Sequence, residues 1–264
     1  MNLVSQWVAF KTIVYREIHR FMRIWVQTLV PPAITIALYF LIFGQLIGSR
    51  IGEMGGFDYM QFVAPGLIMM AVIQNSYANV VSSFFGTKFQ RNIEELLVAP
   101  VLEITILFGY IVGGMARGLG VGVIVTILAL FFTDLTVHNW WITISMVLLT
   151  AMVFSLAGFI NAIFAESFDD ISIIPTFVLT PMIYLGGVFY SINLLPSFWA
   201  NLSLANPILY MVNGFRYGIL GVSDINIWQA YGMLVVFVVL GFSVSLYLMA
   251  KAEKLRTRGD YDDA

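Results

Sequence analysis

A short polar segment at residues 88–100 holds the side chains whose types and spacing suit a contact with another protein. Its charged residues are Lys88, Arg91, Glu94 and Glu95. Apolar residues recur at spacings of four, three and one, at Phe89, Ile93, Leu96 and Leu97. This spacing predicts a short amphipathic helix that Pro100 ends, with the charges on its other side. These charges can pair with a soluble partner, and a solvated connection without a partner is the simpler alternative.

The connection at 165–170, AESFDD, gathers a second set of charged side chains. Its carboxylates are Glu166, Asp169 and Asp170. Three carboxylates on a short loop can bind a divalent cation, but no glycine-bearing ligand loop accompanies them, so we expect no metal. A second, smaller contact with the same partner, a pairing with basic N-terminal residues, or a solvated connection remain as interpretations.

Arg117 is the only charged residue in the long apolar run 104–133. A charge inside a membrane is energetically costly, which makes it a functional candidate. The glycines around it at helical spacing are Gly113, Gly114, Gly118 and Gly122. Small residues let a neighbouring helix approach closely, which favours a protein-facing, structural position for Arg117. The alternative is that it neutralises an anionic group of a substrate.

Residues 1–25 predict an amphipathic helix that lies in the headgroup region of a membrane. Aromatic and aliphatic residues recur every three or four positions, and cations occupy the remaining faces. These cations are Lys11, Arg16, Arg20 and Arg23. We expect the aromatic rings to dip into the membrane and the cations to lie near anionic lipid. A cytoplasmic extension of the first span is the alternative.

Several kinds of chemistry are excluded by residues that the sequence lacks. Cysteine is absent, which rules out disulfides and thiolate chemistry within the chain. No G-x-x-x-x-G-K-[ST] motif is present to hold nucleotide phosphates. An intramembrane enzyme would need clustered His, Asp or Glu within the apolar runs, and Arg117 alone cannot supply acid–base chemistry. We therefore expect no enzymatic activity, no bound cofactor or metal, and no nucleic-acid partner.

The composition indicates an all-α integral membrane protein. Of the 264 residues, 60% are hydrophobic and 11% charged, whereas a soluble domain is about half apolar and about a quarter charged. A helix needs ~20 apolar residues to cross the hydrocarbon core. Six spans are predicted, at 26–47, 61–86, 104–132, 139–164, 171–190 and 228–250. They form one membrane domain over 1–264, with a six-span core at 26–250.

The distribution of Lys and Arg predicts the orientation. Ten of these residues lie in the N-terminal segment, the 88–100 connection and the tail at 251–264. Only two, Arg50 and Arg216, fall in the connections on the other side. Because cytoplasmic loops carry the excess of cations, both termini and the 88–100 segment are predicted to be cytoplasmic. We expect the polar tail to be frayed.

The connection before the last span is long, apolar and interrupted. No Asp, Glu, Lys or Arg occurs between Asp170 and Arg216. The prolines that interrupt this stretch are Pro175, Pro181, Pro196 and Pro207. Such apolar content is unusual for a free outer loop, and two short helices that dip back into the outer leaflet over 192–222 would explain it.

Three motifs in this order and spacing resemble the permease subunits of ABC-2 type ABC exporters. They are FQRNIEELLVAP at 89–100, YLGGVFYSINLLP at 184–196 and NPILYMVNGFR at 206–216. The resemblance covers nearly the whole chain. It implies an N-terminal interfacial helix, six spans, a cytoplasmic coupling helix between spans two and three, and short re-entrant helices before span six. It also implies a bacterial inner-membrane protein.

The resemblance further implies a half-transporter that pairs with a second copy of itself and with a separate cytoplasmic ATPase, which would hold ATP and Mg. The residues at 89–97 that it assigns to the ATPase contact are Phe89, Gln90, Arg91, Asn92, Glu94, Glu95 and Leu96. The acidic loop 165–170 would provide a second contact. The substrate route would lie at the dimer interface, lined by spans one, two and five.

Substrates in such a family include drugs, lipids, glycolipids and polysaccharides, so an amphipathic, lipid-linked or glycan-type molecule moved outward is expected. A secondary transporter or channel that works without an ATPase is the alternative. Arg117 favours this alternative, and the lack of paired, interrupted helices in an inverted arrangement counts against it.

Overall fold

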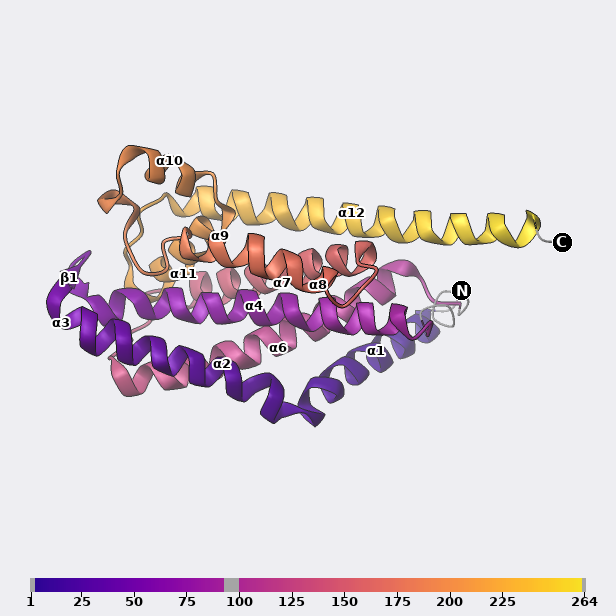
Figure 1. The fold of residues 1–264 in the computed structure, drawn as a ribbon, viewed down its shortest axis with the longest axis horizontal. Coiled ribbons are helices and arrows are strands. Elements are labelled where there is room, and N and C mark those ends of the chain that lie inside the picture. Colours follow the sequence, from indigo (N-terminus) through magenta and orange to yellow (C-terminus); the bar gives the residue numbers. More distant parts are fainter. Residues whose placement is uncertain (1–2, 93–99, 263–264) are drawn as a thin grey trace.

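The computed structural model is all-helical apart from one short hairpin, as the composition predicts (Figure 1). It describes residues 3–92 and 100–262, with side chains up to Lys251 except that of Gln45. The hairpin pairs β1 (Glu53–Met54) with β2 (Phe57–Asp58) in antiparallel register. Gly55 and Gly56 form its turn with positive φ angles of 63° and 83°, which glycine adopts without a steric penalty.

Helix α4 (Tyr59–Phe89) forms the centre of the molecule and runs most of its length in Figure 1. It packs most extensively against α6 (Glu103–Phe132) and α7 (Trp140–Phe164). Its buried residues include asparagine and serine as well as aliphatic side chains, such as Asn75 and Ser76. These polar residues face protein, where Asn75 donates to the Ala71 carbonyl and accepts from Arg117, partners that lipid could not provide.

Four helical segments among the described residues are long and apolar enough to cross a membrane. They are Trp25–Ile51, Glu103–Phe132, Trp140–Phe164 and Ile227–Lys251. These segments match four of the six predicted spans within a few residues. The predicted span 61–86 corresponds to α4, whose polar residues keep it out of this apolar group.

The predicted span 171–190 is wrong in its extent. Its helical part is Asp170–Tyr184, built from α8 (Asp170–Ile173), the π-helical η2 (Ile174–Leu179) and α9 (Thr180–Tyr184). The helix ends early because two glycines follow it, and Gly187 takes a left-handed φ of 70°.

The N-terminal helix α1 (Leu3–Arg23) is separated by Ile24 from α2 (Trp25–Tyr39), which carries Pro31 and Pro32. The Thr28 hydroxyl donates to the carbonyl of Phe21 at 3.0 Å and so bridges the break. After α2 the chain continues through the π-helical η1 (Phe40–Ile47) and α3 (Gly48–Ile51). Helix α1 packs along α6, so it is attached to the bundle over its length.

The two short helices predicted over 192–222 are present as α10 (Ser197–Leu204) and α11 (Pro207–Leu220), after the short 3-10 turn η3 (Ile192–Leu194). Asn206 caps α11, because its side chain accepts from the Ile208 amide at 3.0 Å, and Pro207 occupies the first turn. Helix α11 is buried against α7, α12 (Ile227–Asp262) and α4.

The C-terminal tail differs from the frayed segment that its polarity predicted. Helix α12 continues without a break to Asp262. Lys, Ala, Glu, Leu and Arg dominate residues 251–258, and these are strong helix formers, which accounts for the extension. Both termini lie at the same end of the bundle, beside α1 (Figure 1).

Candidate functional site

The described part of the 88–100 segment is the exit from α4. Phe89 is the last residue of that helix, and Gln90, Arg91 and Asn92 form a turn in which Arg91 has a φ of 60°. The predicted short helix therefore does not begin at Phe89, which belongs to α4 and is followed by a turn. The predicted contact residues Glu94, Glu95 and Leu96 lie outside the described residues.

Lys88 joins the end of α4 to the end of α7. Its Nζ donates to the carbonyl oxygens of Ile163 and Ala165, at 2.7 Å each. These carbonyls belong to the last turn of α7 and the residue after it, where a helix has no backbone donors left and its dipole favours a cation. Sequence analysis placed Lys88 on the polar face of a short helix, but its ammonium group binds the end of α7 instead.

Three aromatic rings connect the same corner to the acidic loop. Phe85 and Phe89 of α4 lie 5.0 Å from the ring of Phe168, measured between ring centroids. Both contacts are edge-to-face, the favoured geometry for aromatic pairs. The loop 165–170 is therefore packed against the start of the 88–100 segment.

The three carboxylates predicted in that loop have different surroundings. Asp170 accepts hydrogen bonds from the amides of Glu166 and Ser167, at 2.9 Å each. These bonds lower the pKa of Asp170 and tie the loop that precedes α8 to the first residue of that helix. Glu166 and Asp169 are exposed and free to meet a partner. In the described part of the chain, no group of three His, Cys, Asp or Glu could hold a metal ion.

Gln6 of α1 holds the downstream end of the segment. Its Nε2 donates to the Pro100 carbonyl at 3.0 Å. Its Oε1 accepts from the Leu102 amide at 3.0 Å and from the Thr105 hydroxyl at 2.9 Å. The Gln6 side chain is nearly buried at the start of α6. It accepts from the Leu102 amide, one of the backbone donors that the start of a helix leaves unpaired.

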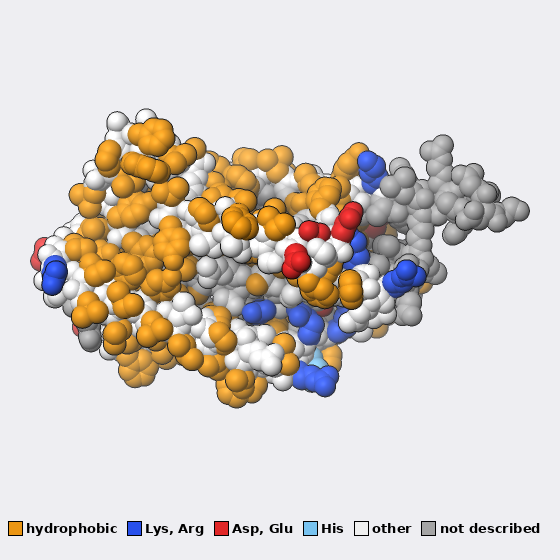
Figure 2. All heavy atoms as spheres, viewed as in Figure 1, with side chains coloured by type: hydrophobic (Ala, Val, Ile, Leu, Met, Phe, Trp, Pro, Cys, Tyr) orange, Lys and Arg blue, Asp and Glu red, His pale blue; other side chains and the backbone are white. Residues whose placement is uncertain are grey.

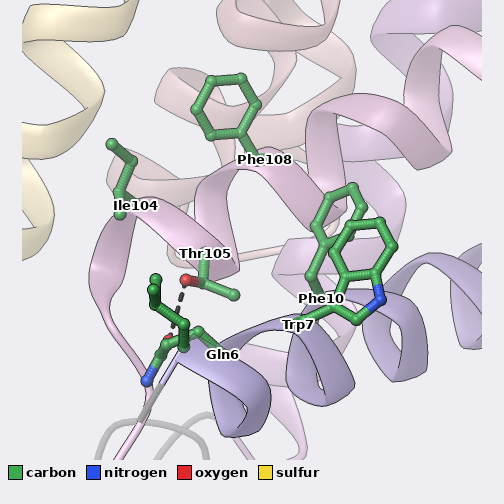
Figure 3. A pocket seen from close by; sticks show the side chains of 7 residues that line it. Gln6, Trp7, Phe10, Ile104, Thr105 and Phe108 are labelled. Carbon is green, nitrogen blue, oxygen red and sulfur yellow. Dashed lines mark hydrogen bonds between the residues drawn. The ribbon is translucent and has the colours of Figure 1, made fainter. Parts of the chain in front are cut away.

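A cavity of about 550 Å³ opens beside this contact, between α1 and the start of α6 (Figure 3). The rings of Trp7 and Phe10 stack along one side of the cavity, with their centroids 5.6 Å apart, and the Phe108 side chain lies on the opposite side. Gln6 and Thr105 are the polar side chains in its lining, and the Thr105 hydroxyl donates a hydrogen bond to Oε1 of Gln6. The cavity is therefore a largely apolar space between α1 and the start of α6.

Glu17 forms a second joint between α1 and the bundle. Its side chain is 1% exposed and accepts from the Ser83 hydroxyl of α4 at 2.7 Å. It also pairs with Arg20 at 3.5 Å and Arg16 at 3.7 Å. On the α6 side it packs against Gly113, where a Cβ atom would lie 2.5 Å from that of Glu17. Sequence analysis did not single out Glu17.

The four cations of α1 do not share one environment, although the sequence predicted a position near anionic lipid for all of them. Arg16 donates to the Tyr110 hydroxyl of α6 at 2.8 Å. Arg20 donates to the backbone oxygen and Oδ1 of Asn79, at 3.0 and 2.8 Å. Lys11 lies 5.0 Å from the ring of Trp7, and Arg23 is exposed. Two of the four cations thus reach into the bundle.

Arg117 lies halfway along α6, as predicted, and donates to Oδ1 of Asn75 on α4 at 3.3 Å. The glycines around it allow the close helix approach that was predicted. A Cβ on Gly118 would collide with Ser76, and one on Gly122 would lie 2.7 Å from a methyl group of Val72. Helix α4 therefore packs directly against the backbone of α6 at this level.

Sequence analysis counted Arg216 among the cations of a connection and did not predict its burial. It is fully buried in α11, where it donates to the carbonyls of Gly187 at 2.7 Å and Phe62 at 3.2 Å. Its guanidinium also lies 3.9 Å from the centroid of the Phe62 ring. Arg216 therefore attaches α11 to α4 and to the glycine turn after α9.

Comparison with known proteins places this geometry in a family. The family model described as "ABC-2 type transporter" matches residues 8–220. The inner membrane transport permease YadH of Escherichia coli K12 is 61% identical over 251 residues, which cover 95% of this chain and 98% of the relative. Nodulation protein J of Rhizobium leguminosarum bv. viciae is 22% identical over 223 residues, which cover 81% and 83% of the two chains.

Proposed function

Because the chain belongs to the ABC-2 type transporter family, we propose that it is the permease subunit of an ATP-driven exporter. It moves an amphipathic, lipid-linked or glycan-type substrate outward from the cytoplasm or the inner leaflet. A separate ATPase binds and hydrolyses ATP with Mg, and this chain has neither enzymatic activity nor a cofactor of its own. The absence of a phosphate-binding P-loop motif supports this division of labour.

The observation that carries the proposal is the attachment of both ends of the 88–100 segment to other helices. Upstream, Lys88 binds the end of α7 and Phe89 packs on Phe168. Downstream, Gln6 of α1 binds Pro100 and the first turn of α6. A force applied to this segment would therefore act on four helices together, as a rigid coupling element requires.

The ATPase contact comprises Phe89 to Asn92, Glu94, Glu95 and Leu96, with Glu166 and Asp169 as a second, smaller contact. The packing of Phe168 against Phe85 and Phe89 supports this pairing, because it brings the acidic loop beside the exit of α4. For ATP binding to move the population decisively, the ATPase must favour one permease state by about 5 kcal/mol over the other.

In the bacterial inner membrane the chain crosses six times as one membrane domain, with α4 and Asp170–Tyr184 joining the four apolar segments. A locally thinned bilayer accommodates the shorter fifth crossing. Both termini are cytoplasmic. The clustering of Lys and Arg at the α1 end of a largely hydrophobic surface supports this orientation (Figure 2). Two copies pair, and the substrate route lies between them.

Co-purification tests the proposal directly. The chain is extracted from its native membrane in mild detergent, and mass spectrometry identifies what accompanies it. A stoichiometric P-loop ATPase is the expected result. A folded permease that is purified without any ATPase would support a transporter or channel that works alone.

A further inference from the structure

We propose that Arg20 and Arg117 form a binding site for the phosphate group of an anionic amphiphile, held at the boundary of the leaflet on the side of the chain termini. The proposal concerns binding and stands whether the amphiphile is transported or retained. It rests on the placement of the two guanidinium groups, on their charge balance and on the hollow that adjoins Arg20.

The two arginines are held side by side by one face of α4. Arg20 of α1 donates to Oδ1 of Asn79 at 2.8 Å, and Arg117 of α6 donates to Oδ1 of Asn75 at 3.3 Å. Asn75 and Asn79 are four residues apart on the same helix, so their side chains lie about 6 Å from each other. Two cations from different helices thus converge on adjacent turns of a third.

The charges at this place do not balance. Three guanidinium groups, of Arg16, Arg20 and Arg117, stand near one carboxylate, Glu17, which pairs with Arg16 and Arg20. Among the described residues Arg117 has a neutral partner, Asn75, and no carboxylate. Buried or membrane-embedded charges are normally paired, so an excess of positive charge here requires an anion from outside the chain.

Several donors at the site also lack a partner. Across residues 3–92 and 100–262, the buried atoms without a hydrogen bond include Nε of Arg20, Nε of Arg117 and Nδ2 of Asn79. Asn79 is fully buried, and its Oδ1 is already bonded to Arg20. A phosphate group has three or more acceptor oxygens, which suits donors that come from separate side chains.

The site lies at headgroup depth. Asn79 is 20 residues along α4 from Tyr59, and at 1.5 Å per residue this is about 30 Å, the thickness of the hydrocarbon core. Arg20 lies five residues before Trp25, where the first apolar segment begins. Both measures place Arg20 where a lipid phosphate would meet it, and Arg117 contacts α4 one turn deeper, at Asn75.

A hollow of about 670 Å³ adjoins Arg20 and can hold the rest of such a molecule. Its lining comes from α1 and combines the cationic residues Arg16, Arg20 and Arg23 with Tyr15 and Ile24. In Figure 2, Lys and Arg side chains gather on this part of the surface beside hydrophobic ones. The combination of cations and apolar groups matches an amphiphile with an anionic head and favours it over free phosphate.

The test uses the full-length chain in mild detergent and native mass spectrometry, with phosphatidylglycerol and phosphatidylcholine as probes. We expect phosphatidylglycerol to be retained more tightly. In Arg117→Gln the loss of a charge-assisted contact should weaken its retention roughly tenfold. Arg50→Gln, which removes an exposed cation at the other end of the molecule, should leave retention unchanged.

A second variant keeps the fold while it removes the need for a ligand. Asn75→Asp combined with Asn79→Asp places a carboxylate against each arginine, so we expect a stable protein that no longer prefers phosphatidylglycerol. Asn201→Asp on the exposed α10 is its control.

Excess inorganic phosphate should displace little lipid if the headgroup and its chains are bound together, and full displacement would instead identify free phosphate as the ligand. Equal retention of the two lipids by the unaltered chain, or undiminished preference in both variants, would overturn the proposal.

Discussion

Oε1 of Gln6 lies 2.9 Å from Oγ1 of Thr105, and this contact joins the interfacial helix α1 to the first turn of α6. The same amide side chain binds the backbone at Pro100 and Leu102. Helix α1 therefore contacts the chain at the end of the 88–100 segment, just before α6 begins. If α1 is the interfacial helix and 88–100 the coupling segment of the proposed function, this contact links the two.

Gln6→Leu should uncouple the ATPase from transport while the partner still binds. The change removes three hydrogen bonds, each worth about 0.5–1.5 kcal/mol, from the joint between α1 and α6. We expect ATP hydrolysis in proteoliposomes to continue and transport per ATP to fall. Thr12→Val on α1 is the matched control, because its hydroxyl bonds only to the Val8 carbonyl of the same helix. Transport per ATP that is equal in both variants would refute a role for Gln6 in coupling.

Lys88→Met should loosen the upstream end of the segment. It leaves the carbonyls of Ile163 and Ala165 without their cation, and a lost charged hydrogen bond lowers the free energy of unfolding by about 1.5–3 kcal/mol. Thermal unfolding in detergent measures this effect, with Lys11→Met as the comparison, because Lys11 is exposed and lies over the Trp7 ring. An unfolding midpoint shared by the two variants would show that the capping contact adds nothing to stability.

Arg216→Leu should be among the most destabilising substitutions in the chain. It removes the bonds to Gly187 and Phe62 and leaves their carbonyls buried without a donor, which costs about 1–3 kcal/mol for each group. Arg50→Leu changes an exposed cation and should have little effect. The yield of monodisperse protein and its unfolding midpoint distinguish the two, and equal stability would contradict the proposed attachment of α11.

Gly118→Ala and Gly120→Ala test the close packing of α6 on α4. A methyl group on Gly118 would collide with Ser76, whereas nothing lies within 4 Å of one on Gly120. Overpacking typically lowers the free energy of unfolding by about 1–3 kcal/mol. Gly120→Ala should be neutral or stabilising, by up to ~1 kcal/mol, because alanine favours a helix. Similar unfolding midpoints for both variants would mean that the helices separate at this level.

The sequence predicts best where one physical requirement dominates. Continuous apolar runs predicted four membrane-length helices, and prolines and Asn206 mark the short helices α10 and α11. Helix α4 is harder to recognise by hydropathy, because its centre is occupied by asparagine and serine that pack inside the protein. The end of α9 at Tyr184 depends on a glycine turn whose left-handed conformation is not visible in periodicity.

The polar contacts that hold the candidate site together were missed for a different reason. Gln6 and Glu17 share the buried stripe of α1 with Ile13 and Phe21, and this stripe is visible as a spacing of three or four residues. Their importance depends on partners more than 60 residues away in the sequence. The burial of Arg216 was missed because it requires α11 to fold back against α4.

The central claim is that residues 89–97 transmit ATPase closure to the bundle, and one measurement tests it most directly. The ATPase partner is reconstituted with the permease, and ATP hydrolysis is measured with and without transport substrate for the unaltered chain and for Glu94→Lys combined with Glu95→Lys. Glu53→Lys is the control, since Glu53 is exposed on β1 at the opposite end of the molecule. We predict that the double reversal abolishes substrate-dependent hydrolysis in a permease that still folds, and that the control preserves it. Unchanged substrate-dependent hydrolysis in the double variant would contradict the account.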